Sequence, residues 1–238
     1  MTDIPSVDDY VLGRGVAQSV RLDAQHLLWK LHMGFVLHPS VPIKENMKIA
    51  ELGCGTGIWL LDLAQELPST VQIHGFDISN KQFPPSFLWP GNVSFSLLDS
   101  LDEPPPSLTE QYDVIHVRMW ASNLRSKDAG ILIQNVRRML KPGGYLQWEE
   151  ADLRRQVVQT PLAETFERDV NDLFERAGLQ YSWVHELSNS LKNGDLQILS
   201  HQQETFGNGL RQFAKREHAE WADHVPRLAL DSRTYVGA

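Results

Sequence analysis

Three glycines at alternate positions, Gly53, Gly55 and Gly57, lie where the pattern of the chain changes. An apolar run before them predicts a short buried strand, and an apolar stripe at helical spacing follows until Pro68. The strand positions are Met47, Ile49, Ala50 and Leu52, and the helix positions are Trp59, Leu60, Leu63, Ala64 and Leu67. Glycine tolerates positive φ and lets a ligand approach the backbone, and the first turn of a helix has unpaired N–H groups. The stretch therefore predicts a cofactor-binding turn.

The spacing of these glycines distinguishes between cofactors. A dinucleotide-binding turn has the pattern Gly-x-Gly-x-x-Gly, and the third position of that pattern is Ile58 here. Glu51 followed by Gly53, Gly55 and Gly57 resembles instead the first motif of the class I methyltransferases that use S-adenosylmethionine (SAM). The resemblance implies that these four residues bind SAM. A tight turn without a ligand is the alternative.

Two further acidic residues follow predicted strands. Asp77 closes the strand predicted from residue 71 and lies 20 residues beyond Gly57, a separation typical of a carboxylate that binds ribose hydroxyls. Because a carboxylate accepts two hydroxyl hydrogen bonds at once, we expect Asp77 to hold the ribose, with a helix cap as the alternative. Asp99 follows an alternating strand at 93–98. The resemblance implies that Asp99 accepts the adenine amino group and that Ser100 frames the ring.

The fourth and fifth predicted strands complete the series. Residues 112–117 form the fourth, with Arg118 and Trp120 at its end as candidates for the methionine part of the cofactor or for the acceptor. We interpret His116, inside this strand, as a core histidine. A helical stripe over 129–140, a stop at residues 141–144 and a strand ending in Glu149 and Glu150 follow. The resemblance therefore covers about residues 47–150.

A leading helix is predicted between about Gly15 and Gly34. Its apolar positions recur at three- and four-residue steps: Val16, Val20, Ala24, Leu27, Leu31 and Phe35. By resemblance such a helix lies over the cofactor pocket, where Tyr10 or Arg14 contacts SAM, and a helix that only covers the sheet is the alternative. The Arg-Leu-x-x-Gln-His pattern from Arg21 and the Trp-Glu-Glu at 148–150 look like the methyltransferases of fungal secondary metabolism and their related regulators.

These elements predict an α/β fold, a Rossmann-like class I methyltransferase sandwich with a mostly parallel sheet and helices on both faces. We expect residues 1–46 to form an N-terminal helical cap and residues 47–238 to form the SAM-binding domain with C-terminal helical additions. The tail predicts helices near 160–178 and 209–225 and a sixth strand at 196–199. No seventh strand is evident, so we expect the last strand to be missing and the acceptor pocket to be affected.

Composition narrows the function further. The formal charge of −8 and the mixed charge pattern argue against a nucleic-acid substrate. Cys54 is the only cysteine, and a small buried filler is favoured over a nucleophile. The start of the chain lacks a signal-peptide pattern and no apolar run has membrane-spanning length, so we expect a cytoplasmic protein without a membrane segment. The histidine spacing predicts no metal site.

We therefore predict a SAM-dependent methyltransferase that acts on O, N or S of a small molecule, in secondary-metabolite biosynthesis. Aromatic residues suggest a partly apolar acceptor: Phe83, Phe87, Trp89, Trp120, Trp148 and Trp183. A hydroxyl acceptor would benefit from a base, for which Glu149, Glu150, His185 and His201 are candidates, with a surface or structural role as the alternative for each. The alternatives are a regulatory or partner-binding protein with the SAM fold and, less favoured, a nicotinamide-dependent oxidoreductase. A homodimer or a protein partner is compatible with either of the first two hypotheses.

Overall fold

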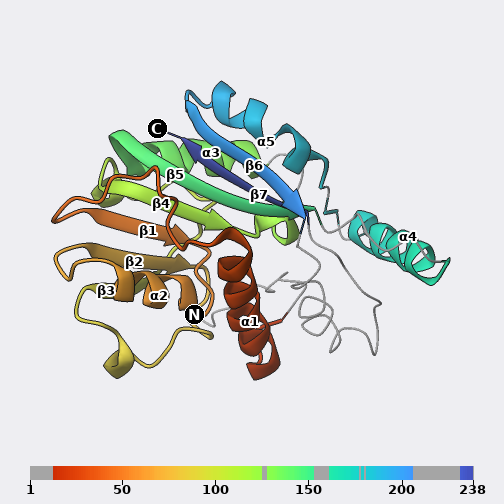
Figure 1. Ribbon diagram of the computed structural model, residues 1–238, viewed down its shortest axis with the longest axis horizontal. Coiled ribbons are helices and arrows are strands. Elements are labelled where there is room, and N and C mark those ends of the chain that lie inside the picture. Colours follow the sequence, from red (N-terminus) through yellow and green to blue (C-terminus); the bar gives the residue numbers. More distant parts are fainter. Residues whose placement is uncertain are drawn as a thin grey trace, which may run out of the picture.

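A seven-stranded sheet forms the centre of the computed structural model, which describes residues 13–124, 128–152, 161–176, 178–179, 181–205 and 231–237 (Figure 1). The strand order is β3-β2-β1-β4-β5-β7-β6. The first five strands are parallel, and β7 pairs antiparallel with both β5 and β6. The strands are β1 (Lys48–Leu52), β2 (Gln72–Asp77), β3 (Val93–Leu97), β4 (Tyr112–Arg118), β5 (Leu140–Asp152), β6 (Ile198–Thr205) and β7 (Asp231–Gly237).

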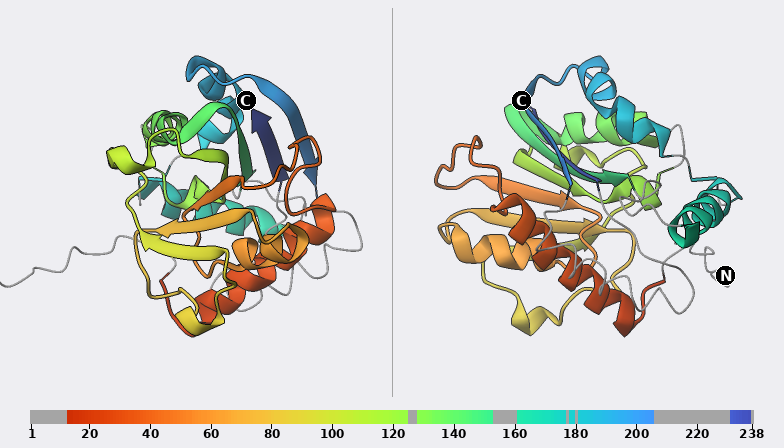
Figure 2. Two further views of the ribbon diagram at one scale, coloured as in Figure 1. Left: turned by 90° about the vertical axis from the view of Figure 1, so that its left-hand side faces the viewer. Right: turned by 45° about the vertical axis from the view of Figure 1, so that its right-hand side comes forward.

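Helices cover both faces of this sheet, as Figures 1 and 2 show. The helices are α1 (Val16–Met33), α2 (Ile58–Glu66), α3 (Asp128–Met139), α4 (Pro161–Arg176) and α5 (Ser182–Asn193), with short 3₁₀ turns η1 (Ser86–Leu88), η2 (Pro106–Leu108) and η3 (Trp120–Ser122). Helix α2 packs on one face and α3 and α5 pack on the other. Figure 1 places α1 beside the carboxyl ends of the parallel strands and α4 apart from the layers.

Two apolar cores lie on the two faces because successive side chains of a strand point to opposite sides. In β1, Ala50 and Leu52 belong to the core under α3 and α5, whereas Ile49 belongs to the core under α2. This alternation places Glu51 on the α2 face, where it is buried. The predicted class I methyltransferase fold is therefore present, with its parallel strands in the expected chain order.

Helix α1 forms where its periodicity predicts, but its apolar stripe faces outward. Val16 is 83% exposed, Val20 59%, Leu27 56% and Leu31 66%. The opposite side of the helix is buried and carries Gln25, His26, Leu28 and Trp29. The side of α1 that faces the domain therefore carries both polar and apolar residues.

The prediction that the last strand is missing is wrong. Residues 231–237 form β7, and its hydrogen-bond partners lie on both sides, in β5 and β6. The segment is short and mostly polar, so its strand structure depends on these two distant neighbours rather than on its own pattern. The strand predicted at 196–199 extends instead over Ile198–Thr205.

Helix α5 was not predicted, although Trp183, Val184, Leu187 and Leu191 have helical spacing and are all buried. The predicted helix at 209–225 lies outside the described residues, as does Tyr10. No helix in the described ranges is long and apolar enough to span a membrane.

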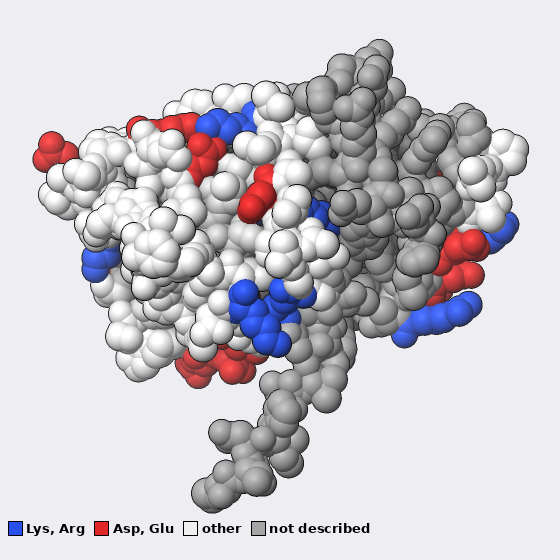
Figure 3. All heavy atoms as spheres, turned by 90° about the horizontal axis from the view of Figure 1, so that it is seen from below, with Lys and Arg blue, Asp and Glu red and all other residues white. Residues whose placement is uncertain are grey.

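Figure 3 shows the face of the molecule seen from below. On this face the Lys and Arg atoms and the Asp and Glu atoms of the described residues lie in separate small groups within a mostly uncharged surface. The described part of this face therefore presents no continuous basic surface of the kind that binds a nucleic-acid backbone.

The place of β7 generates a stability prediction. Thr234 lies between Glu149 of β5 and Gln202 of β6, so a proline there removes an N–H from a strand that is paired on both sides. We expect Thr234→Pro to lower the free energy of unfolding by about 1–3 kcal/mol, whereas Thr234→Val should not, and urea unfolding measures both. Equal stability of the two variants would show that β7 does not pair as described.

Candidate functional site

The glycine turn joins β1 to α2 with all three glycines in the left-handed region. Their φ angles are 69°, 53° and 71° at Gly53, Gly55 and Gly57. A Cβ on Gly53 would lie 2.9 Å from the indole of Trp120, and one on Gly57 would overlap the ring of Phe95. Any other residue would be strained at these positions and would also collide with an aromatic side chain. The turn is therefore shaped by both backbone conformation and packing.

Asp77 at the end of β2 is bonded to this turn. Its Oδ2 accepts a hydrogen bond from the Gly55 N–H at 2.9 Å, and its Oδ1 accepts one from the Ser79 N–H at 3.0 Å. Burial raises the pKa of Asp77, against the opposing effect of these N–H groups and of the charge on Arg14. Since a carboxylate offers about four acceptor sites, Asp77 is suited to accept ligand hydroxyls as well as these N–H groups.

Asp99 and Ser100 follow β3 on the neighbouring strand end. Asp99 Oδ1 accepts a hydrogen bond from the Leu101 N–H at 2.9 Å, and the Ser100 carbonyl accepts one from Asn135 at 3.0 Å. Ile78 after β2 and Leu97 at the end of β3 are 59% and 60% exposed. Exposed aliphatic side chains beside carboxylates are suited to the faces and edges of a heterocyclic ring.

A buried row of polar side chains crosses three strands on the α2 face. Glu51 of β1 pairs in register with His116 of β4, and His116 pairs with Gln147 of β5. His116 Nδ1 lies 3.0 Å from Glu51 Oε1, and its Nε2 lies 3.4 Å from Glu149 Oε2. The imidazole also stacks on Trp59 of α2, with ring centroids 3.8 Å apart and an interplanar angle of 8°. His116 is thus a core histidine, as predicted, but one with two carboxylate neighbours.

The other carboxylate oxygen of this row is unusual. Glu51 Oε2 is buried and has no hydrogen-bond partner among the described residues. A buried carboxylate oxygen without a donor is costly, so such atoms commonly mark a ligand site. Because Glu51 lies two residues before Gly53, this oxygen is close to the glycine turn.

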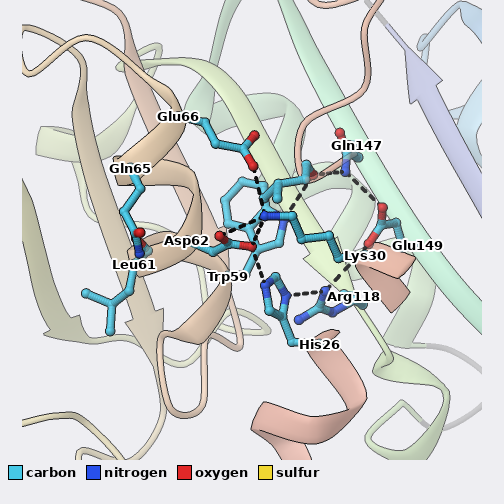
Figure 4. A network of polar contacts seen from close by, with 11 residues as sticks. His26, Lys30, Trp59, Leu61, Asp62, Gln65, Glu66, Arg118, Gln147 and Glu149 are labelled. Atoms are coloured by element: carbon cyan, nitrogen blue, oxygen red, sulfur yellow. Dashed lines mark hydrogen bonds and ion pairs between the residues drawn. The ribbon is translucent and has the colours of Figure 1, made fainter. Parts of the chain in front are cut away.

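Arg118 connects the row to helix α1 (Figure 4). Its Nη1 lies 3.1 Å from His26 Nδ1 and 3.9 Å from Glu149 Oε2. Since a guanidinium only donates, His26 Nδ1 accepts, and its Nε2–H donates to Asp62 Oδ2 at 2.9 Å. Burial and the charge of Arg118 lower the pKa of His26 to about 4, which keeps the imidazole neutral at neutral pH. This fixes both the tautomer of His26 and the orientation of Arg118.

The same network fastens α1 and the chain after it to the rest of the domain (Figure 4). Lys30 Nζ donates to Asp62 at 2.9 Å and to Glu66 at 2.9 Å. Gln147 Nε2 donates to the Val36 carbonyl at 3.0 Å and to Glu149 Oε1 at 2.9 Å. The polar contacts therefore run from the surface of α2 to the centre of the sheet.

Helix α1 also touches the glycine turn directly. The Thr56 hydroxyl donates to Asp23 Oδ1 at 2.7 Å, and a Cβ on Gly55 would lie 3.0 Å from Leu22. Gln82, in the loop after β2, donates to the Ser19 hydroxyl at 3.2 Å. The leading helix thus lies over the turn, where the resemblance places it.

Glu150 of β5 accepts several hydrogen bonds next to Trp120 and the glycine turn. It is fully buried, and its carboxylate accepts from the Trp120 N–H at 2.9 Å, the Ala151 N–H at 3.1 Å and the Trp148 indole N–H at 3.3 Å. The Trp120 indole donates to the Leu52 carbonyl at 3.1 Å and so stays against Gly53. Burial raises the pKa of Glu150 to about 7, although the N–H donors oppose this.

The predicted cofactor-binding residues lie at or just after the carboxyl ends of β1, β2, β3 and β4, except Tyr10, which lies outside the described residues. Two of the candidate bases lie elsewhere, His185 in α5 and His201 in β6. Burial raises the pKa of Cys54, so its thiol stays protonated and fits a structural role. Sequence reasoning did not identify the roles of Trp59, Asp62 and His26. The Gln-His pattern on the leading helix was a signal for His26, but its partners come from elements far away in the chain.

Among the described residues, no group of three or more His, Cys, Asp or Glu side chains is placed to hold a metal ion.

Comparison with known proteins agrees with this geometry. A family described as a methyltransferase domain matches residues 34–201. Methyltransferase grgD of Penicillium sp. is 32% identical over 180 residues, which are 72% of this chain and 62% of the relative. The secondary metabolism regulator LAE1 of Pyricularia oryzae is 32% identical over 149 residues, which are 60% of this chain and 44% of the relative. The matched part is thus less than two thirds of either relative.

A solved structure shares the fold. It is that of Haemonchus contortus phosphoethanolamine N-methyltransferase 2 in complex with phosphomonomethylethanolamine and S-adenosylhomocysteine. The TM-score is 0.65 at 11% identity, and the match covers 98% of this chain and 61% of that one. At this identity the likeness concerns the fold alone.

The burial of Glu150 predicts a pH dependence of stability. The pKa of Glu150 is about 7 in the folded state, whereas the ordinary value, expected in the unfolded state, is 4.5. Between these two pH values the folded state therefore holds a proton that the unfolded state has lost. The free energy of unfolding should fall as pH rises through this window, by at most about 1.4 kcal/mol per pH unit. Glu150→Gln should flatten the slope in urea unfolding between about pH 5 and about pH 7. An identical slope in both proteins would contradict the shift.

Proposed function

Because the chain belongs to the methyltransferase-domain family, we propose that it transfers a methyl group from SAM to O, N or S of a small molecule in secondary-metabolite biosynthesis. The observation that carries this proposal is the glycine turn with three left-handed glycines, bonded to Asp77 and followed by a helix N-terminus. Relatives named as methyltransferases, such as grgD of Penicillium sp., support the reaction class.

The residues present fit SAM. Glu51 Oε2 lacks a partner within the described part of the chain, and an ammonium group is a suitable donor for it. Asp77 ends β2 beside the glycine turn, and a carboxylate, with about four acceptor sites, is suited to the ribose hydroxyls. Ile78, next to Asp77, and Leu97, two residues before Asp99, offer exposed apolar surface for the adenine ring. The donors and acceptors thus match the chemical groups of SAM from one end to the other.

Arg118 completes the site at the methionine end. Its guanidinium is oriented through Nη1 by His26 and Glu149, and the side chain is 12% exposed. A guanidinium held in this way is suited to a carboxylate. We assign to Arg118 the carboxylate of the methionine part.

Bound SAM would supply an activated methyl group on a sulfonium, which an acceptor atom attacks in line. The chain then acts by positioning. The glycine turn, Asp77 and Glu51 hold the methyl donor, and the indole of Trp120 packs against Gly53. Glu149 and Glu150 already accept hydrogen bonds from the protein, which argues against either as the base. We assign no catalytic base.

A second candidate function is a regulatory or partner-binding role on the same fold. Strand β7 is present, so a missing strand gives this role no support, but another observation favours it. Helix α1 exposes four large aliphatic side chains, and an exposed apolar patch is typical of a protein interface. The similarity to the regulator LAE1 of Pyricularia oryzae points the same way.

The proposal predicts the effect of Asp77→Asn on cofactor affinity. Loss of a charged acceptor should weaken binding of S-adenosylhomocysteine (SAH) by about 1.5–3 kcal/mol, which is roughly a 10- to 150-fold rise in Kd. Titration calorimetry of both proteins with SAH, and with NADH as a second ligand, measures this effect.

Asp113→Asn is the matched control, because Asp113 accepts hydrogen bonds from Lys48 and Lys141 at the start of its strand, away from the turn. The control should bind SAH as the unmodified chain does. Unchanged affinity in Asp77→Asn refutes the ribose assignment, and binding of NADH in place of SAH refutes the methyltransferase proposal.

A further inference from the structure

His116 has an environment that packing alone does not require. It is fully buried between β1 and β5, with a carboxylate oxygen facing each ring nitrogen and Trp59 stacked on its face. An apolar residue of similar size would fill this space without bringing polar atoms into the core. The two contacts therefore suggest a role beyond filling space.

The shorter contact determines what His116 does to Glu51. A carboxylate accepts hydrogen bonds, so the His116 Nδ1–H donates to Glu51 Oε1 at 3.0 Å. This bond fixes the rotation of the carboxylate and leaves Oε2 as the oxygen without a partner among the described residues. Without the bond, Glu51 could turn and place either oxygen elsewhere.

The longer contact connects His116 to the groups that orient Arg118. Glu149 Oε2 lies 3.4 Å from His116 Nε2 and 3.9 Å from Arg118 Nη1. Arg118 in turn donates to His26 of helix α1. We assign Glu51 to the ammonium group and Arg118 to the carboxylate of the methionine part. His116 contacts Glu51, and Glu149 contacts both His116 and Arg118, so the two ligand-binding residues are connected through His116 and Glu149.

We propose that His116 is a positioning residue for the amino-acid end of the cofactor, holding Glu51 so that its Oε2 accepts the ammonium group. The inference rests on the proposed function, because it concerns the same cofactor site. His116 does not touch the ligand and acts only through the orientation of Glu51, with Trp59 restricting the rotation of the imidazole.

The proposal is tested by comparing the affinities of two ligands, SAH and 5′-methylthioadenosine. SAH carries the amino-acid end, whereas 5′-methylthioadenosine has the same adenosine and a thioether but no ammonium or carboxylate. A structural defect in the turn weakens both ligands, whereas a misplaced Glu51 weakens SAH alone. The measured quantity is the ratio of the two Kd values, obtained by calorimetry.

Two conservative variants separate the two contacts of His116. The amide nitrogen of asparagine can occupy the place of Nδ1, and that of glutamine the place of Nε2. We expect His116→Asn to keep the preference for SAH, and His116→Gln and His116→Leu to lower it about 10-fold or more. His74→Leu is the control, since His74 of β2 is a sheet histidine bonded to Tyr112 and Ser96 instead.

The possible outcomes are distinct. A preference lowered in the Leu and Gln variants but kept in the Asn and His74 variants supports the proposal. If His116→Leu does not fold, a preference for SAH that is kept in His116→Asn and lowered in His116→Gln supports the proposal in the same way. An unchanged preference in His116→Gln overturns the positioning role while SAH binding by the unmodified chain leaves the proposed function standing. Failure of the unmodified chain to bind SAH overturns both.

Discussion

The burial of charge at the carboxyl end of the sheet is the constraint on which the site depends. Glu51, His116 and Glu149 are all buried, and each would be costly there without a partner. The register of the parallel strands brings them side by side, since Glu51 pairs with His116 and Arg118 pairs with Glu149. The buried side of α1 then supplies His26, while Val16, Val20, Leu27 and Leu31 of the same helix are exposed.

Much of the site could be predicted because it follows local rules. Glycines at a strand-to-helix turn and an acid at the end of the next strand are short-range patterns, and Gly55 and Asp77 are indeed hydrogen-bonded to each other. Other features depend on partners far away in the chain. The sequence around His116 is that of a buried strand and predicts only a core histidine. Its contacts with Glu51 and Glu149, which lie far away in the chain, are visible only in the structure. Strand β7 likewise depends on the neighbours that complete its hydrogen bonds.

Helix α1 shows how periodicity can locate a helix without orienting it. The stripe from Val16 to Leu31 correctly predicts the helix, yet these side chains are exposed and the buried side holds His26 and Trp29. The hydrogen bonds of His26 to Asp62 and Arg118, together with the burial of Leu28 and Trp29, hold the helix in this orientation. The exposed apolar stripe of α1 is compatible with a partner-binding role in addition to SAM binding.

The most direct test of this account is a crystal structure of the chain with bound SAH. The account predicts the ammonium group within hydrogen-bond distance of Glu51 Oε2, about 3 Å, with the ribose hydroxyls on Asp77. His116 should still bond to Glu51 Oε1. SAH bound with its ammonium away from Glu51, or bound at another edge of the sheet, would contradict the account.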